Sequence, residues 1–170
     1  MAVTPAKMSQ KMTLGTSVAT TSGTTKDFTG IPSWAKRVTV SFAGISVSGS
    51  SPILIQLGTA SGVETTGYLG SSGYIQNASQ SLTAALSGGV YLVKDNAATN
   101  ITHGSVVFTL IDAATNTWGI SGVLGNSNNV VPSYVAGSKA LAAVLDRVRI
   151  TTVNGTDTFD AGLCNVLYEG

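Results

Sequence analysis

The sequence predicts an all-β protein, a jelly-roll-like sandwich of about ten short antiparallel strands. Two observations favour this fold class. Only 10% of the residues are charged and 20 are glycine, and a composition this rich in Gly, Ser and Thr favours short strands and tight turns over helices. Several segments also alternate between apolar and polar residues, and turn residues separate them. The 170 residues suffice for one domain with a core.

The clearest strand is predicted over Lys36–Phe42. Val38, Val40 and Phe42 would lie on one face, and the residues between them are polar or charged. This period of two is typical of a strand with one buried and one wet face. Pro32 precedes the strand, where its fixed φ and missing amide hydrogen suit an entrance turn.

The residues before this strand are weakly patterned. We expect 28–170 to form the sandwich body and 1–27 to be an N-terminal attachment arm, which is either a strand or an extended arm that orders on contact. Residues 1–37 carry five cations and one acid, a net charge of +4, whereas the remaining residues carry −3. A basic segment can dock on an acidic partner, although it can also be simply a solvated terminus. The candidates for attachment are Lys7, Lys11 and Lys26.

Further strands follow at short intervals. They are expected at Ile53–Leu57, Val63–Leu69, Val90–Val93, Ser105–Ile111, Asn116–Leu124, Arg147–Val153 and Ala161–Tyr168. The segment Ser105–Ile111 is apolar on both sides, so we expect a central strand that is buried on both faces. Asn154–Gly155 is the strongest hairpin signal because both residues tolerate positive φ.

Three segments interrupt this pattern. Ser138–Leu145 has helical composition and is predicted to be either a short helix or an irregular strand. The segments 70–89 and 125–137 are polar and rich in Gly, Ser or Asn. We expect them to be long exposed loops, where binding would occur.

The sequence offers little for catalysis, so we expect no enzyme activity and no cofactor. His103 is the sole histidine, and no activated nucleophile can be paired with it. We expect a hydrogen-bonded histidine at a strand entrance. Cys164 lies in an apolar strand and is expected in the core. Asp157 and Asp160 could offer oxygens to Ca²⁺, but turn capping is the favoured interpretation and no metal site is predicted.

Sugar binding would use exposed aromatic rings with neighbouring hydroxyls and amides. The candidates for glycan contact are Tyr68, Tyr74 and Tyr134, which lie near Gly-, Ser- or Asn-rich segments. Burial, or a contact between subunits, is the alternative for each of them.

Other partner classes are not indicated. The cations are sparse and no aromatic residues interleave with them, so nucleic-acid binding is not expected. The long uncharged spans are broken by Ser, Thr and Gly, so membrane insertion is not expected. The single cysteine forms no internal disulfide, which fits assembly in a reducing cytoplasm.

Four blocks of the chain resemble a known family in their order. They are 29–59, which includes Pro-Ser-Trp and the strand after it, 61–70, 103–125, and 137–169 with its Asn-Gly hairpin. These blocks are similar to a β-domain family of tailed-bacteriophage tail-fibre and other virion proteins, in a short free-standing version. The resemblance implies a homotrimer that is assembled in the host bacterial cytoplasm and located in the virion. It implies a tail-fibre-like structural protein that contacts other capsid or tail proteins and binds host surface polysaccharide. The alternative is a capsid decoration or cement protein, or a head fibre, with a purely structural role.

Overall fold

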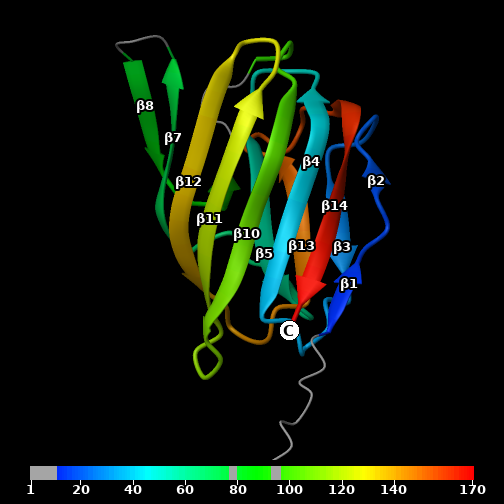
Figure 1. The fold of residues 1–170 in the computed structure, drawn as a ribbon, viewed down its shortest axis with the longest axis vertical. Helices are drawn as coiled ribbons and strands as arrows, with labels where there is room; N and C mark the ends of the chain where they lie inside the picture. Colours follow the sequence, from blue (N-terminus) through cyan, green and yellow to red (C-terminus); the bar gives the residue numbers. More distant parts are fainter. Residues whose placement is uncertain (1–10, 77–79, 93–96) are drawn as a thin grey trace, which may run out of the picture.

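The computed structural model describes residues 11–76, 80–92 and 97–170, and these residues form two antiparallel sheets packed face to face (Figure 1). The prediction of an all-β sandwich is confirmed. The strands number fourteen rather than about ten, because several short strands lie at the sheet edges. Among the described residues no helix is long and apolar enough to cross a membrane.

The larger sheet has nine strands. Eight of them follow one another in space as β1 (Met12–Leu14), β14 (Phe159–Glu169), β4 (Arg37–Val47), β10 (Thr102–Asp112), β11 (Thr117–Asn126), β12 (Val131–Ala140), β7 (Tyr68–Gln76) and β8 (Gln80–Ala85). The ninth, β2 (Val18–Ala19), pairs with β14.

The smaller sheet has five strands. They are β3 (Lys26–Thr29), β13 (Arg147–Thr152), β5 (Ile53–Thr59), β6 (Gly62–Val63) and β9 (Val90–Tyr91). Both β6 and β9 pair with β5, at opposite ends of that strand. The predicted strand at Val90–Val93 is therefore present as β9, although Val93 lies outside the described residues.

The core lies between the two sheets. The alternation predicted around β4 is confirmed, because Val38 and Val40 are fully buried. Phe108 of β10 joins them from the larger sheet, and Ile55 and Ile150 face them from the smaller one. Burial of such side chains contributes roughly 1.5–3 kcal/mol each, so this layer holds the sheets together.

Strand β10 corrects one expectation. It is central, since it pairs with β4 and β11. It is not buried on both faces: Thr109 is exposed, Val107 is half-buried, and Ile111 is 66% exposed. Within the described part of the chain no layer covers the outer side of the larger sheet, so the apolar residues on that side of β10 are accessible.

The segment predicted as a loop at 125–137 and as a helix or irregular strand at Ser138–Leu145 is mainly strand β12, which ends at Ala140. The helical alternative is wrong, because β12 pairs with β11 on one side and β7 on the other. Gly137 permits this close pairing: a Cβ there would overlap the Leu69 carbonyl oxygen. Pairing on both edges outweighs the local helix propensity of these residues.

The expected loop at 70–89 is also largely strand. Residues 70–76 continue β7, which pairs with β8 as a hairpin at one edge of the larger sheet (Figure 1). Residues 77–79 of this predicted loop lie outside the described residues. The serines and glycines of β7 that suggested a loop are tolerated because one side of this strand, which includes Ser71, is open to solvent.

The described part of the predicted arm belongs to the sheets. Strands β1 and β2 pair with β14, and β3 pairs with β13. At the first described residue, the amides of Lys11 and Gly170 each donate to the other's carbonyl oxygen at 2.9 Å. Residues 11–27 thus cover strand edges that would otherwise expose unpaired backbone groups. The sandwich extends to Lys11 instead of beginning at Phe28.

Candidate functional site

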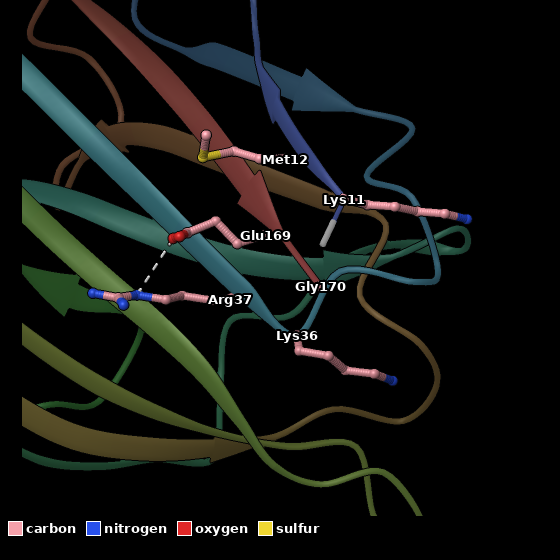
Figure 2. Close-up of a pocket in the computed structure, with 6 residues that line it drawn as sticks. All are labelled: Lys11, Met12, Lys36, Arg37, Glu169 and Gly170. Atoms are coloured by element: carbon pink, nitrogen blue, oxygen red, sulfur yellow. Dashed lines mark ion pairs between the residues drawn. The ribbon is translucent and has the colours of Figure 1, made fainter. Parts of the chain in front are cut away.

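A group of cationic side chains marks the end of the sandwich where the described chain begins. Lys11 precedes β1, Lys36 precedes β4, and Arg37 is the first residue of β4. We call these three residues the basic corner. With Met12, Glu169 and Gly170 they line a hollow of about 340 Å³ (Figure 2). Backbone pairing builds the corner, because the Lys36 amide donates to the Glu169 carbonyl oxygen at 2.7 Å.

The cations of the corner are not equivalent. Arg37 Nε lies 3.5 Å from Glu169 Oε2. Figure 2 shows the side chains of Lys11 and Lys36 extending away from this pair. The Lys11 ammonium lies 5.7 Å from the ring centroid of Trp34, a cation–π contact that leaves its charge uncompensated. Within the described residues, neither lysine forms an ion pair. The corner therefore presents two free positive charges.

Apart from Lys26, which is half-buried in β3, the other described cations have acidic partners, and these pairs lie outside the corner. Lys139 pairs with Glu64, Arg147 with Asp146 at 3.1 Å, and Arg149 with Asp27 at 2.7 Å. The Asp27 hydrogen bond is the main cause that raises the pKa of Arg149. These cations are used within the fold, so the corner is the better candidate for binding an anion.

The three predicted attachment lysines are not gathered in one place. Lys11 belongs to the basic corner. Lys26 is half-buried in β3 and lies opposite Ile150 of the smaller sheet. Lys7 lies outside the described residues. Lys36, which the sequence did not single out, joins Lys11 because β1 and β4 flank the same end of β14.

Tyr68 is buried and serves the core instead of a solvent-exposed site. Only 3% of the residue is exposed to solvent. The hydroxyl accepts a hydrogen bond from the Leu57 amide at 2.7 Å and donates to the Glu64 carbonyl oxygen at 3.0 Å. Burial raises the pKa of this hydroxyl. Because both sides of the ring are enclosed, Tyr68 cannot stack on a sugar from solvent.

Of the other two tyrosines, only one is accessible. Tyr74 faces the interior from β7 and is 4% exposed, whereas Tyr134 on β12 is 42% exposed. Tyr134 lies opposite Val123 of β11 and Gly73 of β7 on the open side of the larger sheet. The alternative of burial thus holds for Tyr68 and Tyr74, and any glycan contact by a predicted tyrosine would depend on Tyr134.

His103 and Cys164 occupy the positions expected of structural residues. His103 is the second residue of β10, and its Nδ1 accepts a hydrogen bond from the Gly44 amide at 3.1 Å. Gly44 has φ of 68° and sits at an irregularity of the β4–β10 register, which this hydrogen bond supports. Cys164 is fully buried, and burial raises the pKa of its thiol to about 11. A thiol held protonated in this way is a poor nucleophile.

Asp157 caps turns, as the favoured interpretation proposed. Its Oδ2 accepts from the Ser51 amide at 2.9 Å, and its Oδ1 accepts from Asn154 Nδ2 at 2.8 Å. The Asn154 hydrogen bond and then the Ser51 amide lower the pKa of Asp157. Within residues 11–76, 80–92 and 97–170, no three His, Cys, Asp or Glu side chains form a group that could hold a metal ion.

The sequence also gave no sign of the Glu64–Lys139 pair. Lys139 has a side-chain exposure of only 5%, and its ammonium donates to Glu64 Oε2 and to the Ala140 carbonyl oxygen. Burial raises the pKa of Glu64, but the hydrogen bonds from Lys139 and the Ala142 amide and the charge of Lys139 together lower it. The pair fastens the end of β12 to the chain between β6 and β7, so its role is structural.

Comparison of the sequence with protein-family models and with curated proteins finds no match. The geometry of the described residues therefore carries the functional argument. It provides a basic corner with two unpaired ammonium groups and an open, largely uncharged sheet face.

Proposed function

We propose that this protein is a structural component of a tailed-bacteriophage particle and that it docks on an acidic surface of another virion protein through its basic corner. The observation that carries the proposal is the pair of free ammonium groups, Lys11 and Lys36, at one end of the sandwich. Residues 1–10, which include Lys7, join the sandwich at this same end. The virion context is supported by the resemblance of the four sequence blocks.

Two exposed charges suit docking better than folding. An exposed ion pair contributes about 0–1 kcal/mol within a fold, whereas a cluster of like charges attracts an oppositely charged surface from a distance. The range of that attraction is about 10 Å at 0.1 M salt, so docking through the corner should weaken as salt rises.

The experiment is incorporation into particles. The double variant Lys11→Glu/Lys36→Glu should be depleted about ten-fold or more from purified particles of the phage that encodes the protein, as measured by quantitative mass spectrometry. The matched control is Thr25→Glu/Thr156→Glu, which adds negative charge at exposed positions away from the corner and from the open face of the larger sheet. The control should be incorporated normally, and melting curves should show that both variants fold.

Two outcomes would refute the proposal. Absence of the wild-type protein from purified particles would reject a virion role. Normal incorporation of the Lys11→Glu/Lys36→Glu variant would reject the basic corner as the docking surface.

Binding of host surface glycan is the second candidate function, and the exposure of Tyr134 favours it. The ring lies among hydroxyl-bearing and small residues on the open side of the larger sheet, as a sugar-stacking aromatic would. If this function is correct, the purified protein binds host polysaccharide and Tyr134→Ala abolishes binding, while Tyr91→Ala, at a half-buried tyrosine of the smaller sheet, retains it. Equal binding by wild type and Tyr134→Ala would refute it.

A further inference from the structure

Strand β1 forms one edge of the larger sheet beside the basic corner, and no described strand covers the outer side of that edge. Lys11 and Gly170 exchange main-chain hydrogen bonds at this end, and the Gly15 amide donates to the Val166 carbonyl oxygen at 2.8 Å. The main-chain groups of an antiparallel strand alternate in direction. The amide and carbonyl groups of Met12 and Leu14 therefore point away from β14, which is the only described strand that pairs with β1. Such an edge can pair with a strand from another chain.

The side chains of β1 add an apolar strip to this open edge. Met12 and Leu14 are two residues apart, so they lie on the same side of the strand, and each is 68% exposed. Their register partners on β14 are Glu169 and Leu167, which lie on the outer side of the larger sheet. Proteins commonly protect an exposed edge with a charged residue or a proline within the strand. Strand β1 contains neither, so open main-chain groups and exposed apolar side chains occur together.

The charge beside this edge is positive. Lys11 directly precedes β1, and together with Lys36 it borders the hollow of about 340 Å³ that Met12 also lines (Figure 2). Arg37 in this hollow is already paired with Glu169. Among the described residues no carboxylate pairs with either lysine. A segment that enters along β1 would therefore meet two uncompensated ammonium groups.

These features favour an extended acidic segment over a folded acidic surface as the occupant. A folded surface can neutralise the lysines, but it leaves the main-chain groups of Met12 and Leu14 bonded only to water. An added strand bonds to these groups, packs alternate side chains on Met12 and Leu14, and brings its carboxylates to the lysines. Like charges on adjacent strands are destabilising, so a basic segment is disfavoured.

We propose that the partner in the virion supplies an extended acidic segment, which adds to the larger sheet as a strand along the open edge of β1. This inference rests on the proposed function and deepens it, because it states the form of the partner and the way in which it binds. Main-chain hydrogen bonds supply affinity in strand addition, and side chains that alternate along the added strand supply specificity. The described edge is three residues long, so the carboxylates at the basic corner add to what the main chain offers.

The first experiment separates the edge from the charges. Leu14→Pro removes the amide hydrogen that faces the open edge and keeps both lysines. Its matched control, Leu14→Val, keeps the amide hydrogen and an apolar side chain. Proline is tolerated in an edge strand where its nitrogen faces solvent, so the pairing of β1 with β14 should survive. Quantitative mass spectrometry of purified particles should show Leu14→Pro depleted about ten-fold or more and Leu14→Val within about two-fold of wild type.

The second experiment uses hydrogen exchange of the wild-type full chain. The amides of Met12 and Leu14 should exchange at least about ten-fold faster in the free protein than in purified particles, because the added strand protects them. Melting curves establish whether Leu14→Pro folds. If it unfolds, the exchange comparison decides.

Normal incorporation of folded Leu14→Pro would overturn the inference, as would equal depletion of Leu14→Pro and Leu14→Val. Equal exchange of the two amides in free protein and in particles would also overturn it. A free wild-type oligomer that Leu14→Pro dissociates would overturn it too, since a second copy would then occupy the edge.

Failure of this inference is distinguishable from failure of the proposed function. Depletion of Lys11→Glu/Lys36→Glu together with normal incorporation of Leu14→Pro rejects strand addition and leaves the docking role of the basic corner in place. Depletion of Leu14→Pro together with normal incorporation of Lys11→Glu/Lys36→Glu rejects the basic corner and, with it, the acidic segment.

Discussion

The Glu64–Lys139 pair gives a quantitative test of how β12 is held. The perturbations are Glu64→Gln, which removes the charge and keeps the side-chain length, and Lys139→Met, which removes the ammonium and keeps an apolar stem of similar length. Lys139 has a side-chain exposure of 5% and Glu64 of 23%. Glu64→Gln leaves a deeply buried ammonium without a charged partner. Lys139→Met leaves a carboxylate without its partner, but water can reach that carboxylate. We therefore expect Glu64→Gln to be the more damaging change.

The magnitudes follow from this asymmetry. Breaking a buried pair by removing one partner costs about 3–5 kcal/mol. The amide oxygen of Gln can still accept from Lys139, so we expect about 2–3 kcal/mol for Glu64→Gln. Lys139→Met keeps the aliphatic stem near Tyr68, whose ring centroid lies 5.6 Å from the Lys139 ammonium, and should cost about 1 kcal/mol. At about 2–4 °C per kcal/mol the two variants should differ visibly in Tm.

The assay is urea denaturation of both single variants and the double variant, which together form a double-mutant cycle. The double variant should cost less than the sum of the single ones, because it leaves no charge unpaired. A coupling energy near zero, or a larger loss for Lys139→Met than for Glu64→Gln, would refute the asymmetry argument.

Three further predictions concern stability and reactivity. Gly49→Ala should cost about 1–3 kcal/mol in urea denaturation, because its Cβ would overlap the Asp157 carboxylate; an unchanged midpoint would contradict this. The pKa values of Glu64 and Asp157 are lower in the folded protein than in the unfolded chain, where they are about 4. The ionised carboxylates therefore stabilise the fold at pH values above about 4, and this stability should be lost as the pH falls through their folded-state pKa values. A midpoint equal at pH values of about 7 and 2.5 would argue against it. Cys164 should resist thiol reagents at about pH 8 until the protein unfolds, and rapid labelling of the native protein would disagree with its buried thiol.

Sequence periodicity identified most of the fold because one face of each long strand is buried. The alternation of Val38, Val40 and Phe42 predicted β4, and Arg147–Val153 predicted β13. Strand β12 was not predicted as a strand because its inward positions include Ser133 and Lys139, which are polar yet buried. Their burial depends on distant partners: Ser133 donates to the Leu92 carbonyl oxygen, and Lys139 donates to Glu64. No local pattern encodes such contacts.

The candidate site was only partly predictable for the same reason. The charge asymmetry pointed to Lys11, but its neighbour Lys36 is brought beside it by pairing of both strands with β14. The tyrosines were chosen for their Gly- and Ser-rich surroundings, and those surroundings are paired strands in which alternate residues point inward. Tyr68 and Tyr74 fall on the inner face, and Tyr134 falls on the outer one. A one-residue change in strand register would turn Tyr68 and Tyr74 toward solvent and Tyr134 toward the core.

The central claim is that the protein joins a phage particle by its basic corner. The most direct measurement is electron cryomicroscopy of the purified particle, with the sandwich fitted into the density. The account predicts that the end bearing Lys11 and Lys36 faces an acidic surface of a virion protein. A sandwich attached by the opposite end, where Asp157 caps the turns, would contradict it, as would particles that lack the protein.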